Sequence, residues 1–184
     1  PSPAQFFVVQ GPTPQAVLQR EEALKSKLAP ELARLSQHGE HLGLSAVSDW
    51  VPSETRQAEN RQLTARAEQQ VLQQVSETLG EDLQRPVFKA EPIELKDWLA
   101  SPASMGVRSQ WLGQIGQGAD QHYASAVLIR GLAHRVQGDA LKAAGEQVEG
   151  VQWADRVSDM SGLLGRFRVT MGWLLLAGHV LVWG

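Results

Sequence analysis

Apolar and polar positions in the first 50 residues predict a strand, a helix and a second strand. Residues 5–10 form a short apolar run, which is typical of a buried strand. Thr13 can cap the following helix, and Pro30 predicts that this helix is kinked or split into a long part and a short continuation. Residues 41–48 alternate loosely and predict the second strand. Apolar residues recur at helical spacing between the two strands: Val17, Leu18, Leu24, Leu28, Leu32 and Leu35.

A long polar helix is predicted next, over residues 54–79. Ser53 suits an N-cap, and Gly80 is a typical stop signal. The apolar residues of this helix form a narrow stripe, which consists of Leu63, Ala67, Val71, Leu72, Val75 and Leu79. A stripe of this width packs against one neighbour and leaves most of the helix in water. We therefore expect an inserted arm that is not part of the central core.

The middle of the chain carries weaker patterns. Pro92 can open a short helix over residues 93–100. Residues 110–115 predict a strand that turns into the next one as a hairpin with a long loop. Both elements precede the clearest strand pattern of the chain.

A second strand–helix–strand unit is predicted from residue 123 onwards. Residues 123–130 form a strand in which Tyr123, Val127 and Ile129 share a face. Asp139 is a suitable N-cap for a short helix over residues 140–148. Residues 151–157 then alternate as a last strand.

The two strand–helix–strand units predict an α+β fold of the ferredoxin-like, or split βαβ, type. In such a fold a four-stranded antiparallel sheet carries both helices on one face. The expected division of the chain is a first βαβ half at 1–50, a mainly helical insertion at 51–110, a second βαβ half at 111–160 and a membrane segment from 161 to 184.

The C-terminal membrane segment is predicted from an apolar run without acid or base over residues 169–184. Trp173 and Trp183 suit membrane interfaces, and Arg166 and Arg168 suit the head-group zone. The run is shorter than the roughly 20 residues of a complete span, so it is expected to be the start of a helix in a longer polypeptide. The competing interpretation is a buried core helix of a soluble protein.

Composition removes several other classes of function. The 184 residues carry a formal net charge of −3, with acids and bases interspersed, so no electrostatic footprint for nucleic acid is present. The absence of cysteine excludes disulfides, thiolate nucleophiles and Cys-ligated zinc. No charged-then-apolar leader is found at Pro1, which also favours a piece of a longer chain.

No catalytic or metal-binding constellation emerges from the sequence. His38, Glu40 and His41 are close together, but zinc needs a third converging ligand and a polar helix end explains them. The glycines between 113 and 118 do not lead from a strand into a helix, as a phosphate-binding loop does. No serine lies in a nucleophile elbow. We therefore predict a protein that is not an enzyme and that uses no metal or other cofactor.

Several segments resemble the MMPL-type predicted exporters of the resistance–nodulation–division superfamily. The resemblance is carried by Trp111-Leu-Gly113, by the strand from Tyr123, by residues 150–161 and by Leu163-Leu-Gly-Arg-Phe-Arg168. It covers residues 111–176 most specifically and is architectural elsewhere. It implies a periplasmic loop, the second of two in preference to the first, followed by the start of a transmembrane helix in a bacterial inner membrane.

The same resemblance implies a part of a proton-driven exporter of lipids or other hydrophobic molecules. The implied partners are the rest of the transporter chain, a lipid-like substrate and the membrane, and an oligomer is left open. No residue matches a proton-relay position. The alternative is a soluble α+β binding or assembly module with a buried C-terminal helix, and a small hydrolase or metalloenzyme ranks third.

Two groups of residues are the candidates for functional roles. Trp50 and Trp98 flank the helical insertion and are the candidates for a substrate path, although core packing is the competing explanation for tryptophan. The second group is expected to couple the domain to the membrane and consists of Asp155, Asp159, Arg166 and Arg168.

Overall fold

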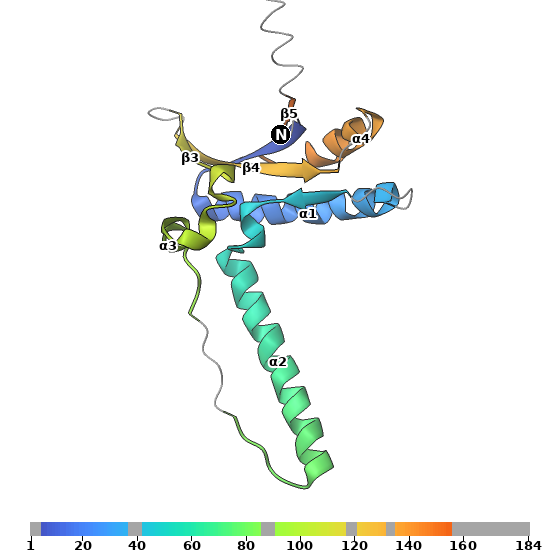
Figure 1. Ribbon diagram of the computed structural model, residues 1–184, viewed down its shortest axis with the longest axis vertical. Helices are drawn as coiled ribbons and strands as arrows, with labels where there is room; N and C mark the ends of the chain where they lie inside the picture. The colour runs from blue at the N-terminus through green and yellow to red at the C-terminus, as the bar shows by residue number, and fades with distance from the viewer. Residues whose placement is uncertain (1–4, 37–41, 86–90, 117–120, 132–134, 156–184) are drawn as a thin grey trace, which may run out of the picture.

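The computed structural model describes residues 5–36, 42–85, 91–116, 121–131 and 135–155. Within these ranges the chain is α+β, with one antiparallel sheet, two helices packed against it and a long helical arm that points away from it (Figure 1). The predicted α+β class is therefore confirmed.

The sheet is five-stranded, and each pair of neighbouring strands is antiparallel. Its main order is β2-β4-β1-β5, and β3 also pairs with β4. The first part of β4 pairs with β3 and its last part with β2, so these two strands follow one another along the same side of β4. The strands are β1 (Gln5–Gly11), β2 (Gly43–Ser45), β3 (Trp111–Ile115), β4 (His122–Arg130) and β5 (Val151–Asp155).

Alternation along β1 and β4 creates one buried face of the sheet. Phe7 and Val9 are fully buried, and they lie opposite Val127 and Ser125 in the register of β1 with β4. Val127 and Ile129 belong to the same hydrophobic cluster as Phe7, and Tyr123 packs against that cluster. The predicted common face of Tyr123, Val127 and Ile129 is thus confirmed.

Helix α1 (Pro14–Ser36) covers this face without interruption. Thr13 caps it, since the backbone N–H of Ala16 donates to Thr13 Oγ1 at 3.1 Å. The predicted split at Pro30 is wrong, because Pro30 lies inside the helix on its exposed side. Leu28 before it and Leu35 after it are buried in the same cluster, and this packing holds the helix together across the missing N–H.

Helix α4 (Arg135–Gly145) packs against α1 and contributes the fully buried Leu141 to the same cluster. The prediction that Asp139 caps a helix over 140–148 is wrong, because Asp139 lies inside α4. The helix begins at Arg135, five residues before the predicted start, and ends at Gly145. Its extent is set by contact with α1 and the sheet, which a local capping signal does not report.

The insertion between β2 and β3 contains α2 (Glu54–Leu79), α3 (Leu95–Ala100) and three short 3₁₀ turns. The predicted bounds of α2 are confirmed. Helix α3 begins later than predicted, because Glu94 is its N-cap and Pro92 lies before it. The 3₁₀ turns are η1 (Val47–Asp49), η2 (Pro102–Ser104) and η3 (Arg108–Gln110).

Strand β2 is shorter than the predicted strand over 41–48. It ends at Ser45, and Val47 starts the 3₁₀ turn η1, which explains why Val47 departs from the alternation.

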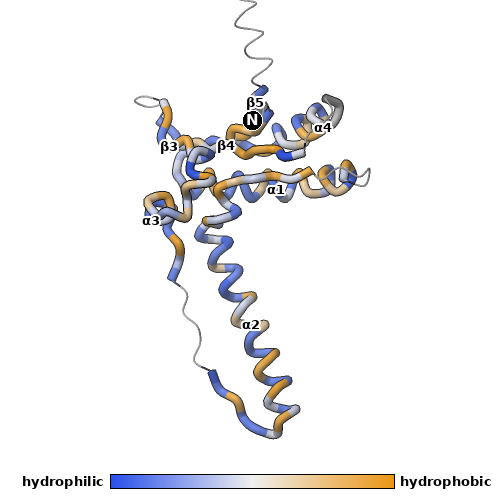
Figure 2. The backbone as a smooth tube through the Cα atoms, viewed as in Figure 1, coloured by the Kyte–Doolittle hydropathy of each residue, from blue (hydrophilic) through white to orange (hydrophobic). Residues whose placement is uncertain are grey.

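Helix α2 and the chain that returns from it form the arm, residues 54–94. None of the residues of α2 is buried. The returning chain runs back beside the helix, with Leu83 N–H donating to Ser76 Oγ at 3.0 Å and Arg85 paired to Glu68 at 3.0 Å. Figure 2 shows hydrophobic positions at intervals along an otherwise hydrophilic arm.

The predicted membrane helix at 161–184 lies outside the described residues, as does the end of the predicted last strand at 156 and 157. Among the helices that the structure does describe, none combines the length and apolar character that crossing a bilayer requires.

Candidate functional site at the root of the helical arm

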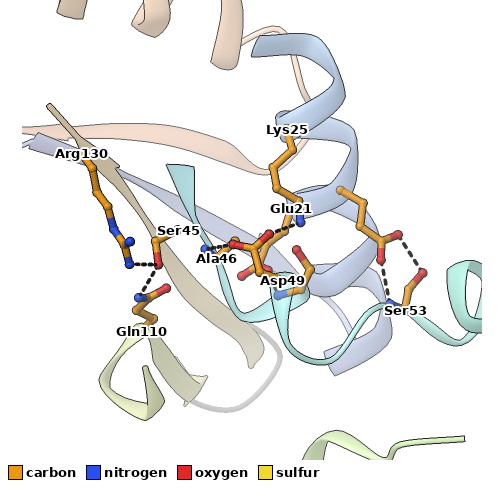
Figure 3. Close-up of polar contacts among 10 residues, drawn as sticks. Glu21, Lys25, Ser45, Ala46, Asp49, Ser53, Gln110 and Arg130 are labelled. Atoms are coloured by element: carbon orange, nitrogen blue, oxygen red, sulfur yellow. Dashed lines mark hydrogen bonds and ion pairs between the residues drawn. The ribbon is translucent and has the colours of Figure 1, made fainter. Parts of the chain in front are cut away.

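The root of the arm, residues 46–54, is held to α1 by a group of buried and half-buried polar contacts (Figure 3). Glu21 of α1 is fully buried. Its carboxylate accepts a hydrogen bond from the backbone N–H of Ser48 at 2.7 Å and another from the hydroxyl of Ser125 at 2.5 Å. One carboxylate thus joins α1, the 3₁₀ turn η1 and the central strand β4.

Glu22, the next residue of α1, holds Ser53, the residue directly before the arm. Its carboxylate accepts from both the N–H and the hydroxyl of Ser53, each at 2.8 Å. Ser53 is the N-cap of α2, and its Oγ accepts from the backbone N–H of Arg56 at 3.2 Å. The cap is therefore fixed on both sides, by its own helix and by α1.

Three further contacts complete the root. Lys25 forms an ion pair with Asp49 at 2.7 Å, and the other carboxylate oxygen of Asp49 accepts from Ala46 N–H at 2.9 Å. Gln15 Oε1 accepts from the N–H of Glu54 at 3.0 Å. Because these contacts come from three successive turns of α1, the start of α2 has one preferred direction relative to the sheet.

The electrostatics of the root centre on Glu21. Burial raises the pKa of its carboxyl above the ordinary value, while the hydrogen bonds from Ser125 and Ser48 and the charge of Lys25 act in the opposite direction. Taking up a proton at Glu21 would therefore alter the hydrogen bonds that join α1, η1 and β4.

Apolar packing supports the polar contacts of the root. Leu18, Val47, Val51 and Leu95 form a small buried cluster that is separate from the main core. The half-buried Trp98 packs against this cluster. Its position fits the packing explanation for this tryptophan.

Trp50 has a different environment from Trp98. It lies directly after η1 and exposes 55% of its surface at the root of the arm. Of the two tryptophans singled out in the sequence, Trp50 is thus the one available to an external hydrophobic group.

A second polar centre joins β2 to the far end of the insertion. Ser45 Oγ accepts from Gln110 Nε2 at 3.1 Å and from Arg130 Nη2 at 3.0 Å (Figure 3). Gln110 is buried, so this contact ties the returning chain to the strand from which the insertion departs. Both ends of the insertion are therefore anchored to neighbouring points of the sheet.

An open hollow of about 530 Å³ lies at the C-terminal end of β1, which is the end at Gly11. Its lining includes Arg20, whose guanidinium donates to the carbonyl of Gln10 at 2.5 Å and pairs with Glu149. Because Arg20 already makes these two contacts within the protein, its guanidinium is not free to bind a ligand in the hollow. The lining residues are Gln10, Gly11, Pro12, Arg20, Gln121, His122 and Gly150.

The residues expected to couple the domain to the membrane are mostly outside the described ranges. Asp155 ends β5 and accepts from Gln5 Nε2 at 3.0 Å. Asp159, Arg166 and Arg168 are not described, and neither are His38, Glu40 and His41.

No catalytic geometry is assembled within the described ranges. Ser125 bonds to Glu21 in the interior, with no histidine in that contact to serve as its base. No cluster of three or more His, Asp or Glu side chains with the geometry of a metal site occurs among the described residues. What the root of the arm does show is a set of hydrogen bonds and an ion pair that fix the start of α2 against α1.

Sequence reasoning missed Glu21 and Glu22. A signal for Glu21 was present, because it lies three residues after Leu18 and three before Leu24, on the face of α1 that is otherwise apolar. A single acid on such a face requires buried donors. The donors are Ser48 and Ser125, and they could not be identified from the sequence because they reach Glu21 only in the folded chain.

Comparison of this chain with protein-family models, with curated proteins and with solved structures finds no match.

Proposed function

We propose that this chain is a periplasmic, porter-like domain of a proton-driven inner-membrane exporter of the MMPL type, which moves lipids or other hydrophobic molecules. The domain itself carries out no chemistry. In this proposal residues 169–184 begin a transmembrane helix, and residues 159–168 transmit its movement to the domain.

The observation that most favours the proposal is the strand order β2-β4-β1-β5, in which each of two strand–helix–strand units contributes two strands. An antiparallel sheet with this order and with both helices contributing to one cluster corresponds to a ferredoxin-like, split βαβ arrangement. We infer this arrangement for the domain, with β3 and the arm as additions. Porter subdomains of the resembled family have the same plan, including helical insertions.

The root of the arm has a natural role in such a machine. Glu21 links α1, η1 and β4, so displacement of the sheet relative to α1 would be passed to the arm through a single buried carboxylate. Trp50, exposed beside this joint, is the residue we propose for contact with a hydrophobic substrate.

Topology is the first test of the proposal. Alkaline phosphatase inserted after Gly80, in the turn that ends α2, should be active in cells that express the complete gene product. A green fluorescent protein at the same point, exported through the Sec pathway, should stay dark. A fluorescent protein and an inactive phosphatase would place the arm in the cytoplasm and overturn the proposal.

The gene beyond the codon for Gly184 provides a second test. Five further apolar spans agree with an exporter, whereas a stop codon at that point contradicts it and favours the alternative of a binding or assembly module.

Lipid distribution provides a third test. Deleting the gene should change how lipids are distributed between the inner membrane and the fractions outside it. An unchanged lipid distribution would count against lipid export.

A further inference from the structure

The arm carries an apolar ridge that none of the described residues of its own chain buries. Five apolar residues recur at strict four-residue intervals along α2, namely Leu63, Ala67, Val71, Val75 and Leu79. The four larger side chains expose 60%, 58%, 38% and 61% of their surface in chain order. Residues four apart lie on one inclined row of a helix surface, so these five form a continuous ridge about 24 Å long at 1.5 Å per residue.

The described part of the returning chain beside the helix, residues 81–85, leaves this ridge open. It contacts Glu68 and Ser76 through Arg85 and Leu83, and Leu72 is half-buried on that same side of the helix. Each of these helix residues follows a ridge residue by one position, about 100° around the axis. Residues 81–85 thus run along one side of the ridge and leave the ridge itself accessible.

The ridge has nearly the same sequence in both directions. Val71 is its centre, Leu63 and Leu79 are its ends, and Ala67 and Val75 lie between. A surface that reads alike in both directions can pair with a second copy of itself about a two-fold axis, since an isologous interface places the same patch on both subunits. Val71 would then lie on the axis.

Charge selects an antiparallel direction for such a pair. The first half of the helix, residues 54–66, holds three arginines and two glutamates. The tip, residues 67–85, holds four acids and one arginine, Arg85, which pairs with Glu68, so the tip stays net acidic. Antiparallel pairing places each acidic tip over the more basic first half of the other arm, whereas parallel pairing would stack the two acidic tips.

The residues beside the ridge are compatible with close approach. On one side they are Gln62, Arg66, Gln70, Gln74 and Thr78, of which four are uncharged. Amide side chains can hydrogen-bond to their counterparts across a two-fold axis without repulsion. Within the described part of the chain Arg66 and Arg61 have no ion-pair partner, so they are available to acids of a second copy.

We propose that the arms of two copies of this chain pair antiparallel through the ridge, with Val71 on the two-fold axis. The ridge is smaller than the roughly 800 Å² per partner of a stable free interface. Pairing is therefore expected between copies that are already close together, where a high effective concentration compensates for small area. The proposal does not depend on the transport function.

The absence of cysteine from the chain makes a direct test available. Val71→Cys should give an oxidised homodimer in cells that express the complete gene product with any cysteines outside these residues replaced. Gln69→Cys is the matched control, because it is also exposed on α2 but lies two residues away and so on the far side of the helix. The Val71→Cys dimer should exceed the Gln69→Cys dimer several-fold.

Direction is tested with two differently tagged copies and a short bis-maleimide. Rows of this kind cross at about 50°, so the ends of the ridge diverge and need a spacer. Leu63→Cys in one copy should cross-link to Leu79→Cys in the other, and Leu63→Cys should not cross-link to itself. The substitutions leave the fold intact, because α2 contributes no buried residue.

The proposal is overturned by equal dimer yields at positions 71 and 69, which would report random collision. It is also overturned by efficient cross-linking of Leu63→Cys to itself, which would report parallel arms. A Val71→Cys product that contains only a different protein would assign the ridge to another partner and reject self-pairing.

Discussion

At the scale of single residues, Gly145 shows how closely α4 approaches the sheet. A Cβ atom at this position would lie 2.6 Å from Cζ of Phe7 and 3.1 Å from Cδ1 of Leu24. Both neighbours belong to the main core and Phe7 is fully buried, so neither can move aside easily. The helix therefore needs a residue without a side chain where it meets β1.

Gly145→Ala is expected to lower the free energy of unfolding by about 1–3 kcal/mol, the usual cost of overpacking a close-packed core. Urea denaturation of the domain measures the change. Gly106→Ala is the control, because a Cβ there meets nothing within 4 Å. Equal stability of the Gly145→Ala variant and the wild type would show that α4 shifts without cost.

Glu21 is predicted to make stability depend on pH. Its folded-state pKa is raised by burial, so over the range between the ordinary and the raised pKa the native protein retains a proton that the unfolded chain releases. The contribution of Glu21 to the free energy of unfolding is fully present below the ordinary pKa. It is lost as the pH rises through the raised pKa. Lys25 and Asp49 are the charged groups beside it.

Glu21→Gln is expected to remove that fall in stability with rising pH, because the amide does not titrate. The measurement is the free energy of unfolding of both proteins across the acidic to neutral range. Glu59→Gln, at an exposed position of the arm, should keep the wild-type profile. Parallel profiles for Glu21→Gln and the wild type would contradict the prediction.

At the scale of elements, two helix caps of the same chemistry should have different consequences. Thr13 caps α1, which supplies much of the core, whereas Ser53 caps α2, which buries nothing. Removing a hydroxyl cap costs about 0.5–2 kcal/mol of helix stability. This loss lowers the free energy of unfolding of the whole domain only where the helix unfolds together with the core.

Thr13→Ala is therefore expected to lower the global free energy of unfolding, whereas Ser53→Ala should chiefly speed amide exchange in the first turns of α2. Hydrogen exchange resolved by segment, combined with denaturation, separates the two. Protection of α2 that is unaffected by Ser53→Ala would mean that Glu22, Gln15 and the rest of the root hold the helix without its cap.

The elements that could be predicted from sequence were those fixed by local signals. Ser53 and Gly80 delimit α2 because a capping hydroxyl and a left-handed glycine act within one helical turn, and Gly80 has φ of 69°. Pro30 and Asp139 are local signals of the same kind, but packing of α1 and α4 against the sheet outweighs them.

The candidate site was less accessible from the sequence than the elements. Residues 15–25 meet residues 46–54 only after the chain has turned back, so no local pattern reveals the contacts of Glu21 and Glu22. The tryptophans were recognisable as residues beside the insertion. Their different exposure could not be foreseen, because it depends on how α3 folds back onto the root.

At the scale of the whole molecule, the arm beyond its root is predicted to contribute little to the stability of the sheet. The arm leaves the sheet after β2 and returns before β3, and both ends are anchored, through Ser53 and through Gln110. None of α2 lies in the core. Each doubling of the length of a loop costs only about 0.6 kcal/mol of folding free energy, through the entropy of closing the loop.

Replacing residues 61–89 by a short glycine–serine turn should therefore leave the free energy of unfolding within about 1 kcal/mol of the wild type. Circular dichroism should show the loss of helical signal from residues 61–79 alone. A shortened protein that does not fold would show that the arm stabilises the sheet.

The division of one sheet edge between β2 and β3 also has a consequence for solubility during folding. An exposed edge strand offers unpaired N–H and C=O groups on which another chain can add a strand. Here that edge consists of a three-residue and a five-residue segment, and the register shifts between Trp111 and Gly113. No long, regular template for intermolecular β-pairing is available along it. By interrupting this edge, the insertion that carries the arm shortens the stretch on which another chain could add a strand.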